Sequence, residues 1–350
     1  MATDTWRACA LGWTAYLALA SAAAPAKELT ILSYSDYIDP DVVAEFETQS
    51  AASIKWVYFE SEYEENKILT DAAGTGYDLV MLSGERIAGH ARRQWLARIE
   101  PDRIPNRRHV ATRWREAYPL AEKHCVPYVW GGYGVAYRSD LVKSPPTSWQ
   151  AFLQPDEAWR GRIAMMRDAR DLIGVALKSL GRSVNTSERA ILREAGDRLL
   201  IQKPFVAAYD YINTTETSAL VSGDLWLAFT YNGDALVLKE HEPAIEFVYP
   251  EEGMGLWVDY WCVMAKGPQT ELALAFLDFT NRPEMAARIA EYIQFATPNE
   301  AAMALVSEEY RDNPLIFPSS EVLEKSEFYR ALAPRATKTV NEVRSLIIRE

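Results

Sequence analysis

The chain has 350 residues, of which 49% are apolar and 25% are charged, an ordinary globular composition that excludes a disordered or low-complexity chain. It is too long for one typical hydrophobic core, so we expect two lobes. The formal net charge of −12 argues against a nucleic-acid-binding protein, which needs cationic contacts to phosphates, and it would raise the local concentration of a cationic ligand.

Residues 1–26 have the pattern of a secretory signal peptide. Arg7 precedes an apolar stretch from Ala8 to Ala20, and small residues up to Ala26 follow it, as at a cleavage site. The apolar stretch is too short to span a bilayer comfortably, although Asp4 offsets Arg7 and leaves an uncleaved anchor as the alternative. We therefore predict a periplasmic protein that is exported through a cleaved N-terminal signal peptide.

The segment after the signal peptide alternates strands and helices. An apolar strand over residues 28–34 is followed by a helix that begins at Pro40 and by a second strand over residues 54–59. A Glu-rich helix over residues 62–72 and a third strand over residues 76–81 come next. This spacing predicts a parallel α/β sheet that is covered by helices on both faces.

A glycine-broken strand over residues 127–137 is predicted to leave the first lobe. The α/β alternation then repeats between residues 145 and 250, with strands expected at residues 162–166, 226–230 and 245–249. A β-rich aromatic run over residues 256–265, a helix over residues 272–280 and a charged helical C-terminus complete the chain.

Polar and aromatic side chains gather where predicted strands end, which is where open α/β sheets bind ligands. The first strand runs into Ser33-Tyr34-Ser35-Asp36-Tyr37, and the third runs into Ser83-Gly84-Glu85. The strand over residues 162–166 runs into Asp168-Ala-Arg-Asp171. Trp257 and Asp259 are two positions apart, so on a strand they project from the same face.

This mixture of acids and rings suits a polyamine, a methylene chain that carries ammonium groups. Carboxylates pair with the ammonium groups, and aromatic faces suit both the methylenes and the charges. The residues with this chemistry are Tyr34, Tyr37, Tyr231, Trp257 and Phe295 together with Asp36, Asp168, Asp171 and Asp259. The alternative for Asp168 and Asp171 is capping of a helix that begins there, and for Trp257 it is a place in the core.

Seven segments occur in the order and with the spacing of a known family: SYSDYIDP, GYDLVMLS, VPYVWGGYGVAY, PTSWQAFLQPDEAWRGRIAMMRDARD, TYNGDA, LWVDYW and ATPNEAA. From about Glu28 to Arg349 the chain resembles the spermidine/putrescine-binding periplasmic proteins, the substrate receptors of polyamine ABC transporters. The resemblance implies an α/β, two-lobe periplasmic-binding-protein fold of type II with the ligand cleft between the lobes. Lobe 1 would comprise residues 27–134 and 258–303, and lobe 2 residues 135–257 and 304–350.

The resemblance also implies a set of ligand-binding residues. They are six aromatic residues, two serines and five acids: Tyr34, Tyr37, Tyr231, Trp257, Phe295 and Tyr329; Ser35 and Ser83; Asp36, Glu85, Asp168, Asp171 and Asp259. The chain departs from the family pattern where Glu85 replaces a usual aromatic residue, Tyr231 a usual Trp and Phe295 a usual Tyr, while Tyr329 falls near a common Gln. An extra carboxylate at Glu85 leads to the hypothesis that a triamine suits the site better than a diamine.

The chain is also similar to a branch of the family that senses norspermidine and spermidine and signals to a membrane-bound cyclic-di-GMP enzyme. The segments AYRSDLVKSPPTSW, RGRIAMMRDARD, LWVDYW and AEYIQFATPNEAA favour this branch. The expected partner is therefore either an inner-membrane ABC permease or a membrane sensor protein. The binding chemistry is common to both, and we expect a monomer in either case.

Two other functional classes remain as alternatives. One is a receptor of the same fold for another small solute. The other is a hydrolase in which Asp168 and Asp171 act as acid and base. No nucleophile elbow, metal triad or Gly-rich phosphate loop accompanies these acids, so we expect neither catalysis nor a cofactor.

Removal of the signal peptide would leave two cysteines, Cys125 and Cys262. Export permits a disulfide bond, but cysteines this far apart in the sequence give no sign of proximity. We expect two small buried thiols.

Overall fold

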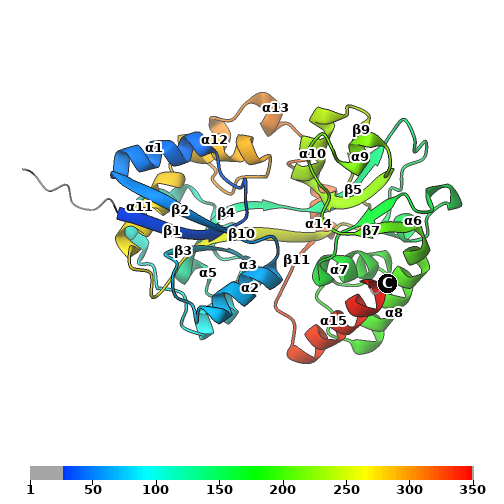
Figure 1. Ribbon diagram of the computed structural model, residues 1–350, viewed down its shortest axis with the longest axis horizontal. Helices are drawn as coiled ribbons and strands as arrows, with labels where there is room; N and C mark the ends of the chain where they lie inside the picture. Colours follow the sequence, from blue (N-terminus) through cyan, green and yellow to red (C-terminus); the bar gives the residue numbers. More distant parts are fainter. Residues whose placement is uncertain (1–26, 349–350) are drawn as a thin grey trace, which may run out of the picture.

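The computed structural model describes residues 27–348, which form two sheets with helices around them (Figure 1). The first sheet has the order β11-β10-β3-β1-β2, and β4 pairs with the other edge of β10. Its strands are β1 (Lys27–Ser33), β2 (Ala52–Tyr58), β3 (Leu79–Ser83), β4 (Cys125–Gly131), β10 (Gly255–Val263) and β11 (Glu327–Phe328). The predicted signal peptide lies outside the described residues.

The second sheet has the order β7-β6-β8-β5-β9. Its strands are β5 (Tyr133–Arg138), β6 (Ile163–Met165), β7 (Val206–Tyr209), β8 (Leu227–Tyr231) and β9 (Ile245–Val248). β6 is parallel to β7 and β8, whereas β5 is antiparallel to β8 and β9. All of these strands lie between β4 and β10 in the sequence, so the second sheet is an insertion between two strands of the first.

Most helices of the first half of the chain surround the first sheet (Figure 1). They are α1 (Pro40–Ser50), α2 (Glu62–Asp71), α3 (Gly84–Arg92), α4 (Thr112–Arg115) and α5 (Ala121–His124), joined later in the chain by α11 (Thr270–Thr280) and α12 (Pro283–Ile293). α1 begins as the sequence predicts, because Asp39 accepts a hydrogen bond from the Asp41 backbone N–H and Pro40 fits the first turn.

The second sheet and the C-terminal segment carry the remaining helices. They are α6 (Trp149–Leu153), α7 (Ala169–Ser179), α8 (Arg189–Gln202), α9 (Ala219–Ser222), α10 (Asn232–His241), α13 (Glu308–Arg311), α14 (Ser320–Lys325) and α15 (Pro334–Ile348). Short 3₁₀ helices lie at Pro101–Arg103, Pro105–His109, Glu157–Trp159, Lys203–Phe205 and Ala302–Ala304. No helix within residues 27–348 is long and apolar enough to cross a membrane.

Each sheet has its own hydrophobic core. In the first core Leu29, Ile31 and Leu32 of β1 are fully buried among the surrounding helices. In the second core the Trp149 ring packs against Phe229, and its indole N–H donates to the Gly253 carbonyl over 2.7 Å. Burying these large side chains in two separate clusters agrees with the expectation that one core would not serve this length.

The prediction of a parallel sheet is confirmed for β1, β2 and β3 and is wrong for the sheet as a whole. β10 is antiparallel to both β3 and β4, so the first sheet is mixed. The reason is topological: β10 returns from the second sheet in the direction opposite to β4. A hydrophobic run predicts a strand, but its direction depends on partners that lie far away in the sequence.

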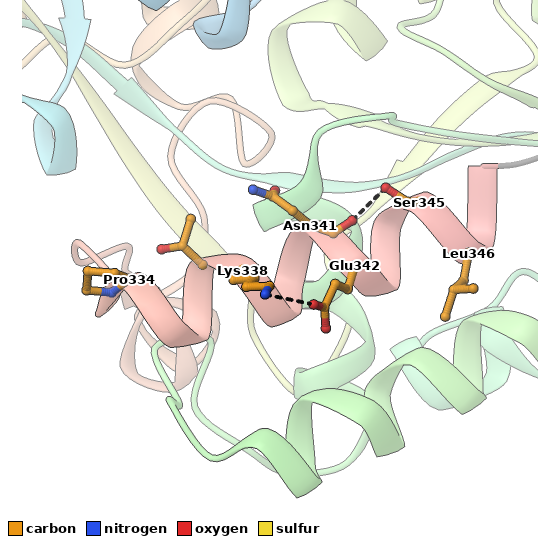
Figure 2. Close-up of a pocket in the computed structure, with 7 residues that line it drawn as sticks. Pro334, Lys338, Asn341, Glu342, Ser345 and Leu346 are labelled. Atoms are coloured by element: carbon orange, nitrogen blue, oxygen red, sulfur yellow. Dashed lines mark hydrogen bonds and ion pairs between the residues drawn. The ribbon is translucent and has the colours of Figure 1, made fainter.

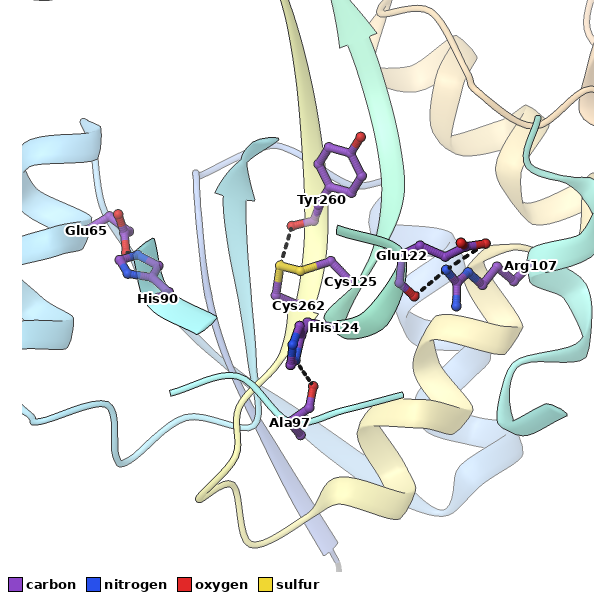
Figure 3. The surroundings of a disulfide bond; sticks show 9 residues. All are labelled: Glu65, His90, Ala97, Arg107, Glu122, His124, Cys125, Tyr260 and Cys262. Atoms are coloured by element: carbon purple, nitrogen blue, oxygen red, sulfur yellow. Dashed lines mark hydrogen bonds and ion pairs between the residues drawn. A yellow bond between two sulfur atoms is a disulfide. The ribbon is translucent and has the colours of Figure 1, made fainter. Parts of the chain in front are cut away.

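The expectation of two free thiols is wrong, because Cys125 and Cys262 form a disulfide bond (Figure 3). They face one another in the register of β4 against β10, with their Cα atoms 4.1 Å apart. Such close opposition is a feature of the non-hydrogen-bonded pairs of an antiparallel ladder. The two cysteines are 137 positions apart in the sequence, and the segment between them contains the whole second sheet.

Candidate ligand-binding site

The turn after β1 supplies two tyrosines. The Tyr34 ring lies edge-on to Phe59, with ring centres 4.4 Å apart, and to Tyr37 at 5.5 Å. The Tyr128 hydroxyl donates to the Tyr37 carbonyl over 2.6 Å and fixes the turn. Burial and the nearby charge of Asp259 raise the pKa of both tyrosines well above the usual value, so their hydroxyl groups stay protonated and can donate.

β10 supplies Trp257 and Asp259 from one face, as their spacing predicts. The Tyr37 hydroxyl donates to an Asp259 carboxylate oxygen over 2.9 Å. Asp259 is only 7% exposed, and burial raises its pKa to about 7, against the opposing effect of the hydrogen bond from Tyr37. The register of β4 against β10 shifts directly after Asp259, a bulge of the kind that often lies beside binding sites.

A row of rings runs from the first sheet to the second. Neighbouring ring centres are 6.1, 4.9 and 5.9 Å apart along the series Tyr37, Phe295, Trp257 and Tyr231, which we call the aromatic row. Gly131 lies opposite Trp257, and a Cβ atom there would come within 2.4 Å of the indole, so only glycine leaves room for this ring.

The N-terminus of α7 supplies the acids of the second sheet. Asp168 caps the helix and accepts a hydrogen bond from the Arg170 backbone N–H over 2.8 Å, so the capping alternative is correct for this residue. Asp171 lies in the first turn, where the Tyr231 hydroxyl donates to it over 2.9 Å. Burial and the charge of Asp168 raise the pKa of Asp171 to about 8, although its location at a helix N-terminus favours a carboxylate.

The start of α3 adds Ser83 and Glu85. The Ser83 hydroxyl donates to the Glu62 carboxylate of α2. Burial, reinforced by the charge of Glu62, raises the pKa of Glu85 to about 8 against the opposing charges of Arg170 and Arg86. In Figure 1, α2 and α3 lie on one side of β11 and α7 lies on the other.

The remaining predicted residues differ in their exposure. Tyr329 is buried in the second core, where its hydroxyl contacts that of Tyr133 at 2.7 Å and the Arg170 guanidinium lies 4.8 Å from its ring centre. Ser35 and Asp36 are exposed, and within the described residues neither forms a hydrogen bond or ion pair with the other predicted site residues. The backbone of Asp36 has a φ of 52°, which turns the chain between the two partly buried tyrosines.

The sequence analysis missed Glu62, the first residue of α2. Its charge raises the pKa of Glu85, Asp168, Asp171 and Asp259, so it lies near all four of these acids. A signal was present, because Ser61 and Glu64 have capping-box spacing just beyond the carboxyl end of a predicted strand. The Glu-rich surroundings made Glu62 look like part of a solvated face.

A groove away from these residues lies along the C-terminal helix (Figure 2). This groove of about 760 Å³ is lined by residues of α15, among them Pro334, Lys338, Glu342 and Leu346. None of the predicted ligand-binding residues lines it, and Lys338 and Glu342 are already paired at 3.9 Å. Within residues 27–348, no group of three His, Cys, Asp or Glu residues could hold a metal ion.

Comparison with known proteins defines the class. Residues 41–318 match the model of the bacterial extracellular solute-binding proteins, and the chain belongs to this family. A solved structure titled a putative spermidine/putrescine ABC transporter, from Listeria monocytogenes, superposes with a TM-score of 0.84 at 27% identity and covers 92% of this chain and 99% of its own. The predicted two-lobe, type II periplasmic-binding-protein fold is thereby confirmed.

Curated relatives narrow the resemblance further. A norspermidine sensor of Vibrio cholerae serotype O1 is 31% identical over 296 residues, which is 84% of this chain and 81% of the sensor. A putrescine-binding periplasmic protein of Pseudomonas aeruginosa is 28% identical over 322 residues, 87% of either chain. The predicted resemblance to the polyamine-binding group is confirmed by these two relatives.

Proposed function

We propose that this protein is a periplasmic receptor that closes its two lobes around a polyamine of the spermidine, putrescine and norspermidine class. The observation that carries this proposal is the aromatic row, which has a buried, tyrosine-bound acid at each end: Asp259 beside Tyr37 and Asp171 beside Tyr231. A buried carboxylate without a cationic partner costs free energy. The aromatic row with its two acids therefore fits a ligand that has separated cationic groups joined by an apolar stem.

The lobes that close would be those given by the resemblance, residues 27–134 with 258–303 and residues 135–257 with 304–350. Asp259 and Tyr37 would hold one ammonium group, and Asp168 and Asp171 would hold another. The faces of Trp257 and Tyr231 would cover the methylenes between them. The ligand would be released chemically unchanged, because the acids would serve only to pair with its ammonium groups.

The chain would deliver its ligand to an inner-membrane ABC permease. The Listeria monocytogenes structure, titled a putative spermidine/putrescine ABC transporter, supports this reading. The second candidate is a sensor subunit that reports polyamine to a membrane cyclic-di-GMP enzyme, and the 31% identity to a norspermidine sensor favours it. Deleting the gene and measuring both labelled polyamine uptake and cellular cyclic-di-GMP separates the two roles.

Binding itself is tested with the mature protein, without the signal peptide, by a thermal-shift screen of putrescine, cadaverine, spermidine and norspermidine, followed by calorimetry. A ligand at 100 times its Kd should stabilise the folded protein by about 2.7 kcal/mol. Tryptophan fluorescence should change because the Trp257 ring would contact the ligand. Lysine, with two ammonium groups and a carboxylate, and γ-aminobutyrate, with one of each, serve as controls. A protein that ignored every polyamine, or that bound the controls equally well, would not be a polyamine receptor.

A further inference from the structure

Glu62 is held in a fixed orientation on the wall formed by α2 and α3. Its carboxylate accepts a hydrogen bond from Ser83 and lies 3.3 Å from an Arg86 guanidinium nitrogen. The side chain is 28% exposed, so it is neither sealed in the core nor free in solvent. Glu85 follows on the next helix, and the charge of Glu62 acts on it directly.

Arg86, the cation beside Glu62, is shared with a second acid. Arg86 is closer to Glu65, at 2.6 Å, than to Glu62. Glu65 is 2% exposed and also contacts the His90 ring at 2.9 Å, so it needs the guanidinium charge for itself. Neither Arg86 nor Arg170 forms an ion pair with Glu85 within the described residues, although both lie close enough to lower its pKa. Arg86 is therefore divided between Glu62 and Glu65, and Glu85 has no ion-pair partner among the described residues.

A buried hydroxyl without a partner lies beside the same two acids. Tyr118 is 4% exposed, and within the described residues its hydroxyl has no hydrogen-bond partner. The ring lies against Gly84, where a Cβ atom would come within 2.1 Å of it, and therefore next to Glu85. After burial, the charge of Glu85 is the largest cause of the raised pKa of Tyr118. A phenol oxygen in this position can accept a hydrogen bond from an ammonium group.

We propose that Glu62 and Glu85, here called the α2–α3 acidic pair, bind a third ammonium group together with the Tyr118 hydroxyl, so that the site selects polyamines with three or more cationic nitrogens over diamines. This rests on the proposed function. A diamine can pair with Asp259 and with the Asp168 and Asp171 group at the two ends of the aromatic row. It then leaves the α2–α3 acidic pair unneutralised, and a triamine does not.

The test is calorimetry with putrescine, spermidine and norspermidine on the wild type, Glu62→Gln, Glu85→Gln and the double variant. Glutamine keeps the size of the side chain and an acceptor for Ser83 but removes the charge. The matched control is Asp71→Asn, which removes an exposed carboxylate from the same helix α2. We expect each glutamine variant to bind triamines about tenfold or more weakly, while its putrescine affinity changes less than about threefold.

The outcomes separate this inference from the proposed function. If both glutamine variants lost putrescine and triamine affinity equally, or lost neither, the acidic pair would not be a third ammonium site, yet the polyamine receptor would stand. If the wild type bound no polyamine, the proposed function itself would fail. Should Glu62→Gln misfold through its contacts with Ser83 and Arg86, Glu85→Gln alone decides, because the Glu85 side chain forms no ion pair within the described residues.

Discussion

The two sheets contribute to the candidate ligand-binding site in different ways. The first sheet is assembled from distant segments of the chain, is fastened by the disulfide bond, and supplies Asp259 from the middle of a strand. The second sheet is one continuous insertion between Cys125 and Cys262, and its acids Asp168 and Asp171 come from a helix N-terminus. The first sheet is therefore fixed by the disulfide bond and by strand pairing. The second sheet is connected to it through β4 and β10, the strands on either side of the insertion.

This difference suggests which wall moves. The disulfide bond joins β4 and β10 within the first sheet, and the Trp257–Gly131 pair lies at the opposite end of the same ladder, towards the second sheet. The ladder between β4 and β10 ends at that pair. We expect lobe closure to be absorbed there, while Asp259 keeps its place in the first sheet.

The largest effect should come from removing the disulfide bond with Cys125→Ala and Cys262→Ala. A loop of this length, 137 residues in sequence separation, is costly to close, so the folded protein should lose about 2–5 kcal/mol of stability. Urea unfolding followed by tryptophan fluorescence measures the loss, and wild type with reductant is the control. Ligand affinity should fall far less than stability. An unchanged unfolding midpoint would show that the first sheet does not depend on its covalent link.

The next effect separates the two roles of Asp168 on the other wall. Asp168→Asn keeps a good helix cap but removes the charge, so polyamine binding should weaken by about tenfold or more with little change in stability. Asp168→Ala should show the same loss of binding and a further loss of about 0.5–2 kcal/mol of stability. Calorimetry and thermal unfolding of both variants distinguish them. If the Asn variant bound polyamine as tightly as wild type, Asp168 would be a helix cap and nothing more.

What the sequence predicted well was local. The two-residue spacing of Trp257 and Asp259 predicts a shared strand face, and Asp168 after a strand predicts a helix cap. What it missed depends on long-range pairing. The register that brings Cys125 opposite Cys262 follows from β10 returning past β4, and no local pattern records it. Glu62 was missed for a similar reason, because only the fold separates it from the solvated glutamates around it.

The last prediction concerns pH and three acids of the candidate site at once. Burial raises the pKa of Asp259 to about 7 and that of Asp171 and Glu85 to about 8, further raised by the charge of Glu62. In an unfolded chain these groups ionise near pH 4. Between about pH 4 and pH 8 the ligand-free folded protein therefore binds more protons than the unfolded chain, so its stability should fall as the pH rises through this window.

Ligand binding should favour the ionised form of these acids, because an ammonium group stabilises the carboxylate and so promotes loss of its proton. Polyamine nitrogens resemble the Lys ammonium, with a pKa near 10, so primary amines stay charged throughout. Affinity should therefore rise from pH 6 to pH 8, by up to about tenfold per pH unit for each acid that loses a proton. Calorimetry in buffers of different ionisation enthalpy counts the released protons.

Tyr37→Phe removes the hydrogen bond that lowers the pKa of Asp259. The variant should therefore shift the part of the pH profile that is due to Asp259 to higher pH and leave the part that is due to the second sheet in place. A profile that is flat in every buffer would mean that the acids are already ionised before the ligand arrives.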